Sequence, residues 1–180
     1  MEIKTDVTLP FPRERVFATY RDRLPELLVY LPNIRKLTVE KREERAGEEV
    51  YLVNEWHGGG EIPAVARSFL RESMLSWTDH ATWKKAEWLC AWSTDVHAFP
   101  GAFQSSGHNR FVETPILVGG DPRAPRGTRI EFRGQLACDA SKVPGVPRLV
   151  ARTLNGTVEK LFVGKIGENL VGVGRASASF

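Results

Sequence analysis

The residues best suited to proton transfer in this sequence are a carboxylate and an imidazole two positions apart, Asp95 and His97. Because alternate residues of a β-strand point to the same side, both would lie on one face of a strand, where the carboxylate could orient the imidazole as a general base. Arg110 is a third candidate for placing protons on a substrate. The same alternation puts Trp88 and Trp92 on the opposite face, which favours a surface position for the Asp95–His97 pair.

Motifs for metal binding and nucleophilic catalysis are missing from the sequence. The four histidines form no i, i+4 pair on a helix and no HExxH motif, so we expect no metal site and no cofactor. No CxxC pair and no Gly-x-Ser-x-Gly elbow is present. Cys90 and Cys138 share the alternation of apolar neighbours, which predicts free, buried and weakly nucleophilic thiols.

Tryptophan is concentrated in one part of the chain. The sequence has five, and four of them lie between positions 77 and 92. An indole ring supplies a large contact area and its N–H can orient a polar group, so such a cluster can form one side of a ligand cavity. Ordinary core packing against a helix is the alternative interpretation, and the two overlap where the core also surrounds the cavity.

These residues must be positioned by a series of strands that is followed by one long helix. Between Val146 and Val171, apolar residues recur every three or four positions, which predicts a helix with one apolar face. Ahead of it the pattern predicts a strand at Ile3–Leu9, short helices at Arg13–Asp22 and Glu26–Leu31, and then about six antiparallel strands. This order belongs to the α+β class.

Composition excludes several kinds of protein. The 180 residues suit one domain, residues 1–180, and a net charge of +3 with scattered basic residues gives no reason to expect nucleic acid as a partner. The charged, strand-like start resembles no signal peptide, and no apolar run approaches the roughly 18 residues that a membrane span needs. We therefore expect a cytoplasmic protein without integral membrane association, and its cysteines fit a reducing compartment.

The order of elements resembles the START-related (SRPBCC) helix-grip superfamily, which includes the birch-pollen allergen and polyketide cyclases. The likeness rests on the opening strand with Pro12–Phe17, on the strands of Trp77–Val96 and on the closing helix. It is greatest to uncharacterised bacterial members. The resemblance implies a curved seven-stranded antiparallel sheet gripping the C-terminal helix over an apolar cavity. The glycine-rich turn of plant members is missing, since Arg45–Glu49 stands in its place.

Members of this superfamily mostly bind lipids, sterols or polyketides, so the resemblance implies an apolar or amphipathic small molecule as the partner. The residues expected to line the cavity are Trp56, Trp77, Trp88, Trp92, Phe111 and Phe132 of the sheet and Leu154, Val158 and Phe162 of the helix. A cyclase or aromatase that uses Asp95, His97 or Arg110 is the alternative, and a protein-interaction module without ligand is a third. Polar side chains pointing into the cavity would favour the cyclase.

Overall fold

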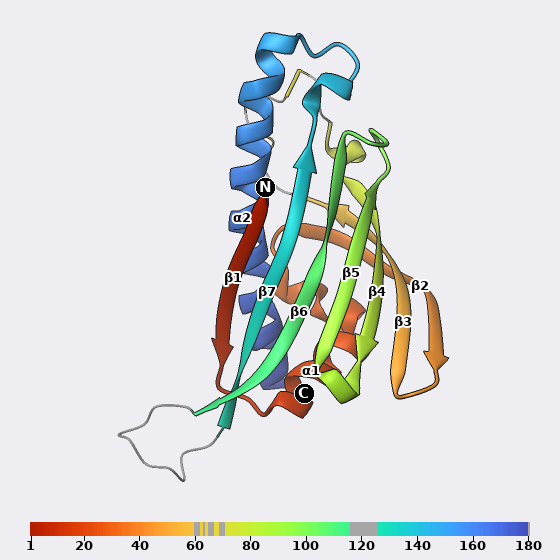
Figure 1. Ribbon diagram of the computed structural model, residues 1–180, viewed down its shortest axis with the longest axis vertical. Coiled ribbons are helices and arrows are strands. Elements are labelled where there is room, and N and C mark those ends of the chain that lie inside the picture. The colour runs from red at the N-terminus through yellow and green to blue at the C-terminus, as the bar shows by residue number, and fades with distance from the viewer. Residues whose placement is uncertain (60–61, 63, 65–66, 69–70, 116–125, 180) are drawn as a thin grey trace.

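The structure is a computed structural model of the chain, which describes all residues except 60–61, 63, 65–66, 69–70, 116–125 and 180 and the side chains of 161–163. Seven antiparallel strands form one curved sheet in the order β1-β7-β6-β5-β4-β3-β2 (Figure 1). The strands are β1 Glu2–Leu9, β2 Ile34–Arg45, β3 Glu49–Gly58, β4 Ser76–Lys84, β5 Leu89–Val96, β6 Phe103–Pro115 and β7 Arg126–Cys138. The predicted α+β fold class is confirmed.

The two short helices after β1 also have the predicted positions. Helix α1 covers Arg13–Asp22, as expected, and the second segment, η1 (Leu24–Tyr30), is a 3₁₀-helix that begins earlier than the sequence pattern suggested. Pro25 lies in the first turn of η1, where its missing amide hydrogen has no helical acceptor to lose. Shorter 3₁₀ turns among the described residues are η3 (Glu72–Met74), η4 (Lys85–Glu87) and η5 (Ala140–Lys142).

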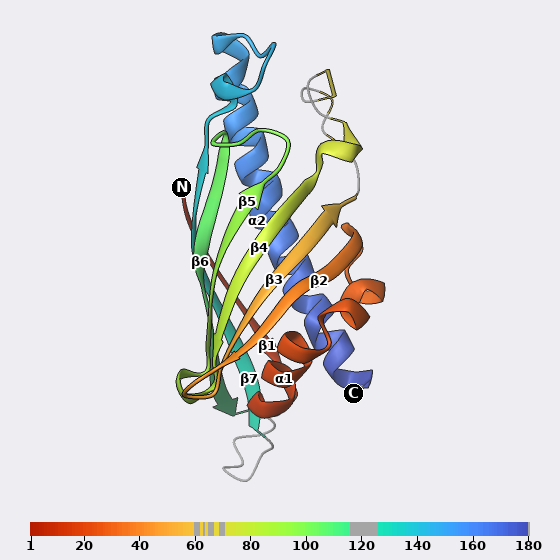
Figure 2. The same cartoon turned by 90° about the vertical axis from the view of Figure 1, so that its right-hand side faces the viewer.

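The long helix α2 (Arg148–Ser179) runs along the concave side of the sheet, as Figure 2 shows. It contacts η5 near its start and β1, β7, α1 and η1 along its length. The predicted end at Val171 was wrong, because the buried face continues through Val173 and Ala176. Gly172 and Gly174 allow this close packing, since a Cβ at either position would collide with the Tyr30 carbonyl or the Leu9 side chain.

Where α1 covers the sheet, the space beneath it is filled with aromatic side chains. Phe17 of α1 packs edge-to-face on Trp83, Phe111 and Trp88, with ring centroids 5.1, 5.1 and 5.3 Å away. Such aromatic pairs add about 0.5–1.5 kcal/mol each beyond the burial of their surface. We call this group, together with Tyr20 of α1, the closed end of the molecule.

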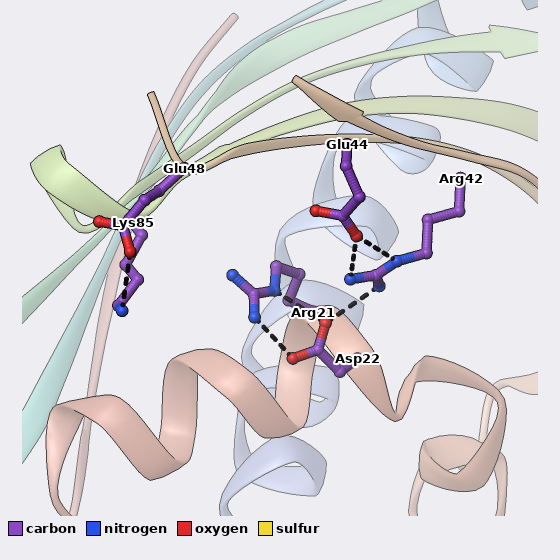
Figure 3. Close-up of polar contacts among 6 residues, drawn as sticks. All are labelled: Arg21, Asp22, Arg42, Glu44, Glu48 and Lys85. Carbon is purple, nitrogen blue, oxygen red and sulfur yellow. Dashed lines mark hydrogen bonds and ion pairs between the residues drawn. The ribbon is translucent and has the colours of Figure 1, made fainter. Parts of the chain in front are cut away.

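Figure 3 shows ion pairs that join α1 to β2 and the β4–β5 turn to the β2–β3 turn. Asp22, at the last turn of α1, binds its neighbour Arg21 at 2.7 Å and Arg42 of β2 at 3.0 Å. Partial burial would raise the pKa of Asp22, but the hydrogen bonds from the two arginines lower it below its ordinary value. Lys85 binds Glu48 at 3.1 Å and so joins the β4–β5 turn to the β2–β3 turn.

Candidate functional site

A row of polar side chains crosses the inner face of the sheet from β3 to β6. The strand register places Asn54 opposite Asp79, Asp79 opposite Thr94, and Thr94 opposite Ser105. Asn54 Nδ2 donates a hydrogen bond to Asp79 Oδ2 at 3.0 Å, and the Thr94 and Ser105 hydroxyls are hydrogen-bonded at 2.5 Å. We call these four residues the polar row. They face inward because they share the strand alternation of Leu52 and of the other buried inner-face residues.

Aromatic rings border the polar row on both sides. On one side Trp56 lies opposite Trp77, and their rings stack with centroids 5.9 Å apart and planes 5° apart. On the other side Trp92 lies over two glycines. A Cβ at Gly107 would come within 2.8 Å of the Trp92 ring, and a Cβ at Gly134 within 3.0 Å. Because neither glycine has a side chain, the indole ring of Trp92 can lie directly over the backbone at these two positions.

The Trp92 ring is fixed from two further directions. It stacks on Phe132 of β7 with a centroid separation of 5.0 Å, and its Nε1 donates a hydrogen bond to Asn109 Oδ1 at 3.2 Å. Buried indole N–H groups usually find such a partner. Trp92 is thus an oriented part of the inner face, while Phe132 beneath it is buried.

The inner face around the polar row is incompletely covered. Asp79 keeps some exposed surface, as do Trp56, Trp77 and Trp92. At the closed end, Phe17, Trp83 and Phe111 are buried, while Trp88 and Tyr20 stay partly exposed.

The middle of α2 is only partly covered. Between Leu154 and Leu170, none of the helix residues with described side chains is fully buried. Ile166 nevertheless packs against the main core. A methyl group added at Gly156, Gly164 or Gly167 would have no neighbour within 4 Å among the described residues outside the helix backbone, so these three positions make no close contact with the sheet.

Asp79 is the ionisable group of this inner face. Burial raises its pKa from 3.8 to about 6, although the hydrogen bond from Asn54 and the charge of His80 act in the opposite direction. Burial likewise raises the pKa of Tyr20 and of Cys90, and the Asp79 charge contributes to both.

Two buried polar atoms beside Asp79, Asn54 Oδ1 and Trp56 Nε1, have no hydrogen-bond partner among the described residues. The indole N–H of Trp56 nevertheless points close enough to the carboxylate to lower the pKa of Asp79, although the contact is not a well-formed hydrogen bond. Unpartnered buried polar atoms are rare in native proteins.

The remaining residues expected to line a cavity lie elsewhere. Trp88 and Phe111 belong to the closed end, where the Arg13 guanidinium lies 4.1 Å from the centre of the Trp88 ring. Leu154 is buried in a separate cluster with Ala140 and Ala151 near the start of α2. Val158 is half-buried in the partly covered middle of the helix, and the side chain of Phe162 lies outside the described residues.

The residues considered for proton transfer are on the outer face of the sheet. Asp95, His97 and Arg110 are all exposed. His97 is hydrogen-bonded to Ser76 Oγ at 3.0 Å and to Thr78 Oγ1 at 2.8 Å, not to Asp95. Asp95 instead lies 3.3 Å from His80 Nε2. The carboxylate–imidazole pair therefore joins two neighbouring strands and does not face the helix.

Sequence reasoning overlooked Asn54 and Asp79, although the signal was available. Asn54 has the parity of Leu52 and Trp56, and Asp79 has the parity of Trp77 and Ala81. A polar residue flanked at i−2 and i+2 by inward apolar residues faces inward itself.

Cys138 departs from its prediction too. It is half-buried, donates to Asn155 Oδ1 at 3.3 Å, and burial raises its pKa to about 11.

No group of three or more His, Cys, Asp and Glu side chains among the described residues converges in a way that could hold a metal ion. None of the described helices is both long and apolar enough to cross a bilayer.

Comparisons with known proteins identify the fold. No protein-family model matches the chain, and no curated protein sequence does. Among solved structures, TTHA0849 from Thermus thermophilus is similar with a TM-score of 0.70 and 18% sequence identity, over 99% of this chain and 98% of that one. Ara h 8.0201 is similar with a TM-score of 0.56 and 10% identity, over 100% and 99%. The chain therefore has the helix-grip fold of these proteins.

Proposed function

We propose that residues 1–180 form one helix-grip unit that binds an apolar or amphipathic small molecule, of lipid, sterol or polyketide type, between the sheet and the middle of α2. The observation that carries this proposal is the incomplete burial of Trp56, Trp77 and Trp92. All three lie on the inner face and remain partly exposed. A wide aromatic surface that faces inward without being covered is typical of a ligand site.

The ligand would contact these tryptophans and the apolar side of α2 at Val158. The likeness to other helix-grip structures agrees with this proposal at the level of the fold. An interaction module whose interior is filled by its own side chains fits less well, because the inner tryptophans are not covered as Phe17 is.

Binding can be tested by tryptophan fluorescence and native mass spectrometry of the freshly purified chain. Long-chain alcohols, sterols and aromatic polyketides should shift the emission, and a small-molecule mass should travel with the folded protein. Trp77→Phe should reduce the response, whereas Trp88→Phe, at the closed end, should leave it. If neither method detects a ligand across the panel, the proposal is wrong.

Catalysis of the cyclase kind is a second candidate function, and the inward orientation of the polar row favours it. A carboxyl with a pKa of about 6 can accept a proton near neutral pH. Asp79 also lies on the inner face of the sheet, whereas Asp95 and His97 lie on the outer face. The measurement is a change in mass of a poly-β-ketone probe by dehydration. That change should disappear in Asp79→Asn, and activity that survives this substitution would exclude Asp79 as the base.

A further inference from the structure

The two halves of the polar row differ in how well their polar atoms are satisfied. Thr94 and Ser105 bond to each other. In the other half, Asn54 donates an amide hydrogen to Asp79. Its Oδ1 accepts no hydrogen bond from another described residue, although only 1% of Asn54 is exposed. This half therefore has acceptor capacity that the described protein atoms do not use.

Among the described residues of β3 to β7, no inner-face position holds a lysine, and Arg126, at the start of β7 and far from the row, is paired with Glu113. The arginine nearest along the inner side of β2, Arg42, is already paired with Asp22 and Glu44. A negatively charged ligand group placed beside Asp79 would therefore meet a like charge, with no unpaired lysine or arginine among the described inner-face residues of the sheet.

The acceptors of this half, Asp79 and Asn54 Oδ1, can take the hydrogen of a ligand group that donates one.

We propose that Asn54 and Asp79 form a subsite for a hydrogen-bond-donating group, a hydroxyl or an amine, on an otherwise apolar ligand, and that this subsite disfavours carboxylates. The inference rests on the proposed binding function and specifies its ligand class. The stacked Trp56 and Trp77 on one side, and Trp92 on the other, would contact the apolar body of the ligand on both sides of this group.

The test uses the full chain and four ligands with the same alkyl chain: n-decanol, decylamine, decyl methyl ether and decanoate, each below its aggregation concentration. The ether has an oxygen acceptor but no hydrogen to donate. Calorimetric titration should give n-decanol and decylamine affinities about tenfold or more above those of the ether and decanoate, the value of one hydrogen bond to a charged group. Equal binding of alcohol, ether and decanoate would overturn the subsite.

Two substitutions test whether Asp79 of the polar row causes this ligand selectivity. Asp79→Asn keeps the side-chain shape and should lower the decylamine affinity about tenfold while strengthening decanoate binding. Asp95→Asn, the same change on the outer face, should leave the order of affinities intact. Unchanged selectivity in Asp79→Asn overturns the subsite but leaves the binding function standing. If none of the four ligands binds the unmodified chain, the binding function fails and this inference fails with it.

Discussion

Asp79→Asn should stabilise the protein at neutral pH, because the wild-type carboxylate is ionised in a poorly hydrated position. Raising its pKa from 3.8 to about 6 corresponds to about 3 kcal/mol at pH 7, since each pKa unit is worth about 1.4 kcal/mol. The asparagine carbonyl can still accept the hydrogen bond from Asn54, but its amide brings two donors that need partners. We therefore expect a net gain of about 1–3 kcal/mol.

The sign of the pH dependence follows from the direction of this shift. The folded-state pKa lies above the unfolded value, so the folded protein binds this proton more tightly. Stability from this group is greatest below about pH 4, declines as the pH rises through the window from 3.8 to about 6, and is constant above it. Asp79→Asn has no such proton, so the difference between variant and wild type should grow across that window.

Urea unfolding followed by tryptophan fluorescence, at several pH values from about 4 to about 7, measures this difference across the window in which the group titrates. Subtracting wild type from variant removes the contributions of all other carboxylates, which both proteins share. Asp95→Asn is the matched control, because it makes the same substitution at an exposed position on the outer face of the sheet. A variant that is less stable by the same amount at every pH would refute the desolvated position of Asp79.

Two further predictions concern packing and thiol reactivity. Gly107→Ala should lower the free energy of unfolding by about 1–3 kcal/mol, because the new methyl group collides with Trp92 and the Arg133 carbonyl. Gly156→Ala should raise it by up to about 1 kcal/mol in the same urea titration, and equal effects of the two would contradict this difference in packing. In thiol titration of the folded protein, Cys138 should react, faster as the pH approaches about 11, while Cys90 should react only after denaturation.

The sequence predicted the fold well because the fold depends on periodic burial. Alternation located the strands, and the bounds of α1 were predicted as observed. The end of α2 was missed because Gly172 and Gly174 weaken the intrinsic preference for helix, and only tertiary contact with η1 and β1 explains why they are there. The second short segment became a 3₁₀-helix, a distinction that a short apolar pattern does not make.

The candidate site was predicted less completely, for two physical reasons. Strand alternation predicted that Trp56, Trp77 and Trp92 face inward. This alternation is interrupted, however, at a residue whose backbone is not extended. Trp88 has φ of 51°, outside β5, and its ring lies at the closed end. The polar row went unrecognised because strand alternation gives the direction of a side chain, while the pairing of Asn54 with Asp79 depends on the register between strands, which the sequence pattern leaves open.

The closed end and the polar row have different roles in the molecule. Phe17 and its aromatic neighbours, with the Asp22 ion pairs outside them, supply packing that does not depend on a ligand. The polar row instead costs stability, since burial raises the pKa of Asp79 and Asn54 Oδ1 has no hydrogen-bond partner among the described residues. Unfavourable polar burial of this kind is typical of functional sites, where a ligand completes the missing interactions. If the row serves binding, ligands that donate a hydrogen bond should stabilise the wild type against unfolding more than they stabilise Asp79→Asn.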